Sequence, residues 1–157
     1  MPTPPIPPGY HSLQPCFICH DAAKAIEFYK ELFGAVEVMR MPQPGSDRLM
    51  HAELRLGDSV LMLADEFEAW GVHSPKKYGG SPVSLMHYVP DVDAVFAKAV
   101  QMGCQAAFPP TDQFWGDRHC KFTDPFGHVW GVATHQFDPT PEQLAEGARK
   151  FAAGGCE

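Results

Sequence analysis

The stretch from Trp115 to Trp130 carries the most distinctive chemistry in this 157-residue chain. Near its start, three polar residues of different types follow one another: Asp117, Arg118 and His119. A guanidinium binds carboxylate or phosphate groups through paired hydrogen bonds, so Arg118 is a candidate contact for an anionic ligand. The alternative is an ion pair between Asp117 and Arg118 that fixes the loop or closes a hairpin.

Three large aromatic rings lie close to this polar cluster in the sequence, namely Phe114, Trp115 and Trp130. Aromatic side chains form the walls of sites for planar ligands, but they also fill hydrophobic cores. The sequence favours neither role over the other. No glycine-rich phosphate loop or nucleophile elbow occurs, so nucleotide binding and triad hydrolysis have no support.

A second group of residues has the chemistry of metal ligands. His51 and Glu53 lie two positions apart in an alternating segment, a spacing that can chelate, and with His135 they would form a relocated site for a divalent metal. The alternative interpretation is that His51, Glu53 and Arg55 form the solvated face of an amphipathic strand. Cys16-Phe17-Ile18-Cys19-His20 matches the pattern of haem attachment, but a strand would point its two thiols to opposite faces. We therefore interpret the cysteines as free thiols.

The segments around these residues recur with one spacing. Asp47-Arg48 precedes Asp117-Arg118 by 70 positions, and Gly57 precedes Gly127 by the same distance. Asp residues in N-cap positions, helical apolar spacing and glycine stops predict one helix in each copy. Each copy therefore reads as a β-α-β-β-β unit, with expected strands at 12–20, 35–41, 48–56 and 59–64, and at 83–89, 104–108, 118–123 and 128–135.

These elements organise the whole chain. We expect a proline-rich, mobile lead over 1–9, the first unit over 10–64, a linker with one helical turn over 65–82, the second unit over 83–136 and a C-terminal helix over 137–157. Thr140-Pro141-Glu142-Gln143 is a capping-box start for that helix.

The bulk composition excludes several classes of partner. Hydrophobic content of 45% and charged content of 20% are globular values, and the formal net charge of -7 argues against nucleic acid or an anionic membrane. No apolar run of about 18 residues predicts a membrane span. The first residues lack the basic and apolar regions of a signal peptide, so a cytoplasmic location is expected.

Paired β-α-β-β-β units resemble the vicinal oxygen chelate superfamily, which includes glyoxalase I, bleomycin-resistance proteins and extradiol dioxygenases. The marks are Asp21…Phe28-Tyr29…Phe33-Gly34 in the first unit and Asp124-Pro125-Phe126-Gly127 in the second. Trp115-Gly116-Asp117-Arg118, followed by D-P-F-G-H-V-W-G, looks similar to the PhnB-like branch. The resemblance implies an α+β fold in which the two units form an open, cupped mixed sheet around a cavity, with the C-terminal helix added.

The resemblance also implies where a metal would bind. Metalloenzymes of this superfamily place His, Glu or Gln on the first and last strands of each unit, which correspond here to Gln14, Met62 (or Leu61), Ser84 and Gly131. Met, Ser and Gly cannot replace the anionic or imidazole donors that such metals need. We therefore expect no cofactor, and a divalent metal only through the relocated set His51, Glu53 and His135.

The function expected from these observations is binding of a small aromatic or drug-like ligand by a homodimer, without the family metal site. The alternative is a metal-dependent lyase, isomerase or dioxygenase with relocated ligands, so the sequence leaves open whether the protein is an enzyme. The candidate cavity residues are Gln14, Cys16, Met62, Ser84, Met86, Tyr88, Trp115, Arg118, Trp130 and His135.

Overall fold

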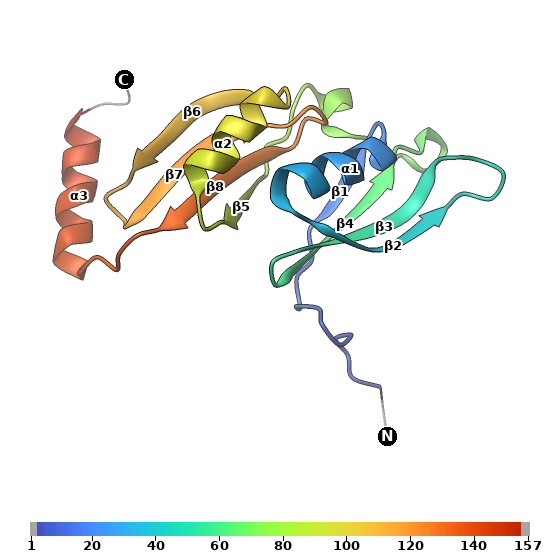
Figure 1. The fold of residues 1–157 in the computed structure, drawn as a ribbon, viewed down its shortest axis with the longest axis horizontal. Helices are drawn as coiled ribbons and strands as arrows, with labels where there is room; N and C mark the ends of the chain where they lie inside the picture. The colour runs from blue at the N-terminus through green and yellow to red at the C-terminus, as the bar shows by residue number, and fades with distance from the viewer. Residues whose placement is uncertain (1–2, 155–157) are drawn as a thin grey trace. The chain divides into compact units, whose positions relative to one another are not determined.

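The chain folds into two compact units, each built on one four-stranded mixed sheet (Figure 1). The computed structural model describes residues 3–154. One unit contains the chain up to Pro82 together with Phe126–His128, and the other contains the remaining residues from Val83 onward. The strand orders are β1-β4-β3-β2 and β5-β8-β7-β6, with one parallel pair in each sheet. The α+β class with two β-α-β-β-β units and a C-terminal helix is confirmed.

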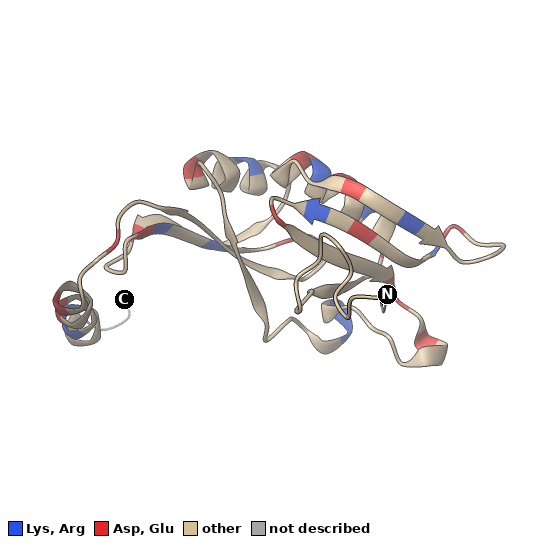
Figure 2. Ribbon diagram, turned by 90° about the horizontal axis from the view of Figure 1, so that it is seen from below, with Lys and Arg blue, Asp and Glu red and all other residues tan. Residues whose placement is uncertain are grey.

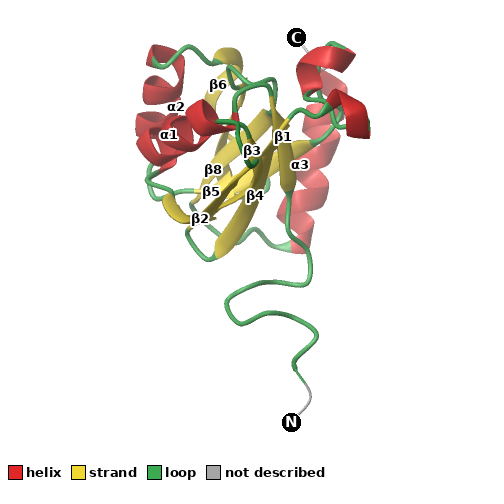
Figure 3. Ribbon diagram, turned by 90° about the vertical axis from the view of Figure 1, so that its right-hand side faces the viewer, coloured by secondary structure: helices red, strands yellow, loops and turns green. Residues whose placement is uncertain are grey.

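The first unit consists of β1 (Cys16–Cys19), α1 (Ala22–Phe33), β2 (Val36–Pro42), β3 (Leu49–Leu56) and β4 (Ser59–Asp65). Helix α1 begins at the N-cap Asp21, whose side chain accepts a hydrogen bond from the Lys24 amide, and it ends at the left-handed Gly34. Its buried stripe includes Ile26 and Tyr29, and it covers one face of the sheet (Figure 3).

Asp65, at the end of β4, ties α1 to the sheet. Its side chain is 6% exposed. Its Oδ1 accepts a hydrogen bond from the Ala22 amide at 2.8 Å, and its Oδ2 accepts one from the Leu49 amide at 2.6 Å. The sequence assigned Asp65 to the linker, but its side chain joins the start of α1 to the start of β3 within the first unit.

The D-P-F-G turn of the second repeat contributes side chains to the first unit. The His128 ring stacks on Phe17, with centroids 3.7 Å apart, and its Nε2 lies 3.1 Å from the Ile18 carbonyl oxygen. Phe126 packs edge-on against Phe28 at 5.6 Å. Two residues at this turn, Phe126 and His128, therefore pack in the first unit in addition to forming part of the turn region.

The second unit consists of β5 (Ser84–Tyr88), α2 (Val92–Gln101), β6 (Gln105–Asp112), β7 (Asp117–Thr123) and β8 (Val129–His135). The sequence predicted a strand only to Phe108 and a loop afterwards, whereas β6 continues through Pro109 and Pro110 to Asp112. Its pairing with β7 shifts register twice around these prolines. Proline is tolerated because β6 is an edge strand.

Two short 3-10 helices, Glu68–Trp70 and Pro75–Tyr78, lie in the segment between the units, where one helical turn was predicted. Helix α3 (Pro141–Gly154) starts with the predicted capping box. The Thr140 amide donates to Gln143 Oε1 at 2.8 Å, and the Gln143 amide donates to Thr140 Oγ1 at 3.2 Å.

Helix α3 meets the rest of the second unit at Phe114. A Cβ added at Gly147 would lie 2.5 Å from the Phe114 side chain, so glycine allows the helix to approach closely there. In the view of Figure 2, basic residues are interspersed with acidic ones and form no continuous stripe. None of the helices within residues 3–154 is both long and apolar enough to cross a membrane.

Candidate functional site

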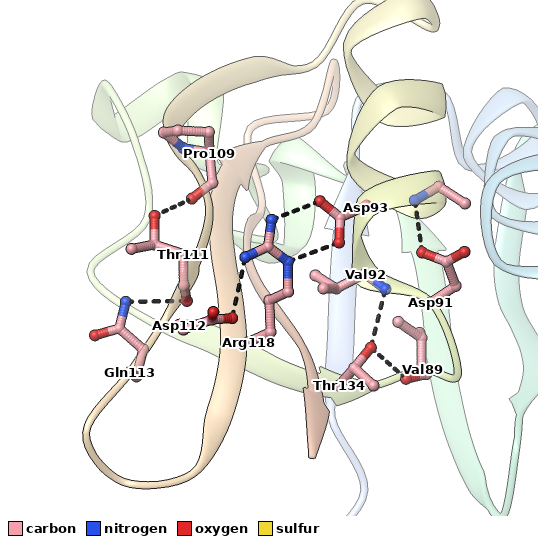
Figure 4. A network of polar contacts seen from close by, with 11 residues as sticks. Val89, Asp91, Val92, Asp93, Pro109, Thr111, Asp112, Gln113, Arg118 and Thr134 are labelled. Atoms are coloured by element: carbon pink, nitrogen blue, oxygen red, sulfur yellow. Dashed lines mark hydrogen bonds and ion pairs between the residues drawn. The ribbon is translucent and has the colours of Figure 1, made fainter. Parts of the chain in front are cut away.

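Strand alternation divides the side chains of the second sheet between two faces. Arg118 and Thr134 contact α2, because Arg118 binds Asp93 and Thr134 Oγ1 accepts from the Val92 amide (Figure 4). Directly paired residues point to the same side of a sheet, so the registers of β5, β6, β7 and β8 define the opposite face. We call it the open face of the second sheet. It carries Met86, Tyr88, Phe108, Asp117, His119, Lys121, Gly131, Ala133 and His135.

Asp117 is the centre of a polar cluster on this face. Asp117 is only 3% exposed. Tyr88 Oη donates to Asp117 Oδ2 at 3.0 Å, and His135 Nδ1 lies 2.8 Å from Asp117 Oδ1. On its other side, His135 Nε2 lies 3.1 Å from Asp138 Oδ1. Tyr88 and His135 were predicted cavity residues, and the structure brings them together through Asp117.

The carboxylates around His135 favour its protonated form. Hydrogen bonding to Asp117, and then to Asp138, raises the pKa of His135 above its ordinary value. The same Asp117 carboxylate raises the pKa of Tyr88, because it accepts a hydrogen bond from the neutral phenol and so stabilises that form. His135 therefore donates from both ring nitrogens when it is charged.

Replacing His135 with Asn is expected to remove a pH-dependent part of the stability. Because the folded pKa of His135 is raised, its stabilising contribution is fully present below its ordinary pKa of about 6.5 and is lost as the pH rises through the folded value. The difference in melting temperature between the native chain and His135→Asn should therefore be largest near pH 6 and shrink toward pH 9. A difference that does not change with pH would contradict this assignment.

His119 lies on the same strand as Asp117, two residues further along. Both ring nitrogens are buried, and neither has a hydrogen bond within the described residues 3–154. Its ring lies 5.1 Å from that of Phe108 and 6.2 Å from that of Trp115, measured between centroids. Burial lowers the pKa of His119, so the imidazole is neutral near pH 7 and offers one donor and one acceptor.

Glycine at position 131 provides the space for this ring. A Cβ at Gly131 would lie 2.9 Å from His119 Nε2 and 3.2 Å from Met86 Cε. His119 thus fills space next to Gly131, one of the positions that the resemblance implies for a metal ligand. The sequence placed His119 in the polar cluster but not among the cavity residues. Its two-residue spacing from Asp117 on one strand is the signal that would have included it.

The structure corrects the expectation for Arg118. Adjacent residues of a strand face opposite sides, so Arg118 does not pair with Asp117. Its Nε and Nη2 donate to the two carboxylate oxygens of Asp93 at 2.7 and 2.8 Å, and its Nη1 donates to Asp112 at 3.0 Å (Figure 4). These bonds raise the pKa of Arg118 further and use the guanidinium to fasten α2 to β6 and β7. It is therefore not presented to a ligand on the open face.

Trp130 also lies on the α2 side of the sheet. It is 2% exposed, and its Nε1 donates to Asp124 Oδ2 at 2.9 Å. Of the two roles considered for the aromatic rings, Trp130 therefore has the core role. The Trp115 ring lies beside that of His119. The third ring of the group, Phe114, lies between Trp115 and the α3 residue Phe151.

The four positions that the resemblance implies for metal ligands lie on, or just before, the strands of the two parallel pairs. Met62 pairs with Cys16, and Gly131 pairs with Met86. Gln14 precedes β1 and donates to the His11 carbonyl oxygen at 2.8 Å, while its Oε1 is buried without a hydrogen bond. Ser84, the first residue of β5, pairs with Val129. Burial alternates along β1, so that Cys16 is exposed and Cys19 is buried.

Of the relocated metal set, His51 and Glu53 contact each other, while His135 has other partners. Glu53 accepts a hydrogen bond from Tyr10, and its Oε1 lies 3.0 Å from His51 Nε2, whereas His135 contacts Asp117 and Asp138. Within residues 3–154, no three His, Cys, Asp or Glu side chains are grouped closely enough to hold a metal ion. Glu53 is also only 6% exposed, so it does not belong to a solvated face.

Comparison with known proteins places this fold in a family. The model of the Glyoxalase/Bleomycin resistance protein/Dioxygenase superfamily matches residues 12–132, and the chain belongs to this superfamily. It is 41% identical over 124 residues to an uncharacterized protein of Mycobacterium tuberculosis, a match that covers 77% of this chain and 72% of that protein.

Two solved structures illustrate the range of similar folds. One is a PhnB protein from Bacillus cereus, described as a putative 3-demethylubiquinone-9 3-methyltransferase, with a TM-score of 0.60 and 19% identity over 79% of this chain and 99% of that one. The other is TnmS3, an antibiotic binding protein from Streptomyces sp. CB03234, with a TM-score of 0.60 and 24% identity over 80% of this chain and 96% of that one. At these identities the similarity establishes the fold.

Proposed function

We propose that the chain binds a small aromatic ligand on the open face of the second sheet. The observation that carries this proposal is His119, whose two buried ring nitrogens have no hydrogen bond within the described chain. Leaving buried polar atoms without partners costs about 1–3 kcal/mol per group, so their presence needs a reason. A ligand that accepts a hydrogen bond from one nitrogen, or donates one to the other, supplies that reason.

The surroundings of His119 favour a planar ligand. Phe108 and Trp115 provide rings beside the imidazole, and Met86 and Tyr88 are 50% and 57% exposed on the same face. Thioether and aromatic side chains make favourable contacts with aromatic molecules. The net charge of -7 favours a neutral or cationic molecule over an anion.

The proposed binding needs no metal at the family position. Met62, Gly131 and Ser84 lack the donors that an oxygen-preferring or borderline metal requires, and Gly131 is packed against His119 and Met86. The antibiotic-binding description of TnmS3 is in line with a binding role for this fold. We also propose that the protein acts as a homodimer, which analytical ultracentrifugation of the native chain would test.

His119→Leu is the sharpest test of the proposal. A thermal-shift screen of planar neutral and cationic compounds would first identify binders of the native protein. For such a compound, His119→Leu is expected to raise the dissociation constant at least about tenfold. One hydrogen bond to the ligand is lost, and the ligand group that made it is left unpaired. The free protein should be no less stable, because an apolar side chain removes two unpaired polar atoms from the interior.

His87→Leu is the matched control. The His87 ring lies on the α2 side of the same sheet, 6.5 Å from the Trp130 ring, so this change should leave the affinity unaltered. If no compound in the screen stabilises the native protein, or if His119→Leu binds as tightly as the native chain, the proposal fails.

A further inference from the structure

The first sheet also has an open face, opposite α1, and the N-terminal segment of the chain contacts it. The register of β3 with its neighbours places His51, Glu53 and Arg55 on this face. Arg55 Nη1 donates to the Gly9 carbonyl oxygen at 3.3 Å, and Tyr10 Oη donates to Glu53 Oε2. The segment is seen below β1 in Figure 3. The sequence assigned residues 1–9 to a mobile lead and Tyr10 to the first unit, and these contacts involve Gly9 and Tyr10.

Glu53 is the polar centre of this face. It lies between Met39 of β2 and Met62 of β4, which are its direct partners across the two neighbouring strands. Burial raises the pKa of Glu53, but the hydrogen bonds from Tyr10 and His51 outweigh it and leave the pKa below its ordinary value. The carboxylate is therefore charged, and it depends on two donors, only one of which belongs to the sheet.

The donor from outside the sheet is a phenol on a weakly attached segment. Residues 3–9 are all exposed, Leu13 is 84% exposed, and the segment forms no strand. The next residue also contacts the first unit, because His11 Nε2 lies 3.2 Å from the Asp58 carbonyl oxygen. A ligand hydroxyl can form the same kind of charge-assisted hydrogen bond to Glu53 as Tyr10 does, so it can compete with the segment for this face.

We propose that Tyr10 is an internal occupant of a second ligand site, and that this site takes hydroxylated aromatic molecules in competition with the N-terminal segment. The hydroxyl of the ligand donates to Glu53 in place of the Tyr10 hydroxyl, and its ring lies between the thioethers of Met39 and Met62. The site uses residues of the first sheet, whereas the one proposed around His119 uses residues of the second. An internal competitor lowers the apparent affinity by the fraction of molecules in which it is bound.

The same arrangement occurs once in each unit, which supports a binding role. In the second sheet, the buried Asp117 accepts from the Tyr88 hydroxyl and contacts His135. In the first, the buried Glu53 accepts from Tyr10 and contacts His51. The difference is that Tyr88 belongs to a strand of the sheet, whereas Tyr10 lies on a segment that can leave. A donor that a ligand can replace is therefore expected at Glu53 in the first sheet and not at Asp117 in the second.

The test uses 2-naphthol as the probe and naphthalene as the matched compound without a hydroxyl. In protein with ¹³C-labelled methionine methyl groups, 2-naphthol should shift the Met39 and Met62 signals, and naphthalene should shift them far less. Tyr10→Phe removes the competing hydroxyl but keeps the ring, so it should tighten 2-naphthol binding up to about tenfold. Glu53→Gln should abolish the preference for 2-naphthol over naphthalene.

His119→Leu separates this site from the one on the second sheet, because it should leave 2-naphthol binding at Met39 and Met62 unchanged. If Tyr10→Phe binds 2-naphthol no more tightly than the native chain, the internal-occupant proposal is overturned. The same holds if the shifted methyl signals are those of Met86 alone. Should Glu53→Gln fail to fold, the Tyr10→Phe comparison still decides, since that variant keeps every side-chain group of the sheet.

Discussion

Replacing Gly116 with alanine is expected to be among the most destabilising single changes in the second unit. A Cβ at this position would lie 2.0 Å from the Phe137 carbonyl oxygen, and the backbone has a φ of +97°. The Gly116 carbonyl oxygen also accepts hydrogen bonds from the Gln136 and Phe137 amides, at 2.8 and 3.2 Å. The added methyl group must therefore displace backbone that Gly116 itself anchors.

The expected loss is about 2–5 kcal/mol, combining about 1–2 kcal/mol for a left-handed non-glycine residue with about 1–3 kcal/mol for overpacking. Urea unfolding would measure it as a lower midpoint with an unchanged slope. Gly103→Ala is the matched control, because Gly103 has a φ of +92° and nothing within 4 Å of its added Cβ. Equal losses for both variants would show that the contact with Phe137 contributes nothing.

Asp65→Ala is expected to produce the largest loss in the first unit. The Asp65 carboxylate is the acceptor for the Ala22 amide at the start of α1 and for the Leu49 amide at the start of β3. Alanine leaves both buried donors without a partner. Because each unsatisfied buried group costs about 1–3 kcal/mol, the loss of both partners is expected to cost about 2–6 kcal/mol, a large part of the stability of an ordinary domain.

Asp21→Ala provides the comparison for Asp65→Ala at the same end of α1. Asp21 is the N-cap and accepts from the Lys24 amide at 3.0 Å in an exposed position, so its loss should cost about 1 kcal/mol. Equilibrium unfolding of the two variants under one set of conditions gives the ratio directly. A cost for Asp65→Ala no greater than that for Asp21→Ala would mean that water replaces the carboxylate at both amides.

The helices and the paired units were predictable because their signals are local. Asp21 and Asp91 cap helices whose apolar residues recur at helical spacing, and both side chains accept the expected amide hydrogen bonds. The length of β6 was not predictable from local preference, since Pro109 and Pro110 disfavour a strand. Only the position of β6 at a sheet edge makes those residues acceptable.

The candidate site was partly predictable from strand parity. Parity correctly placed Tyr88 and His135 on one face, but it was not applied to Asp117 and Arg118, which were read as a neighbouring ion pair. Arg118 instead binds Asp112 and Asp93, and no local rule identifies Asp93, which lies 25 positions away on α2. Likewise, the contact between Tyr10 and Glu53 spans 43 positions and depends on where the N-terminal segment lies.

The prolines of β6 also affect how sheets of different molecules can meet. Proline has no backbone N–H, so the edge strand β6 lacks two adjacent backbone donors, at residues 109 and 110. An incoming strand therefore cannot form a continuous ladder along β6, which is a recognised protection against aggregation. The opposite edge strand, β5, contains no proline between Ser84 and Tyr88, so it keeps all of its backbone donors.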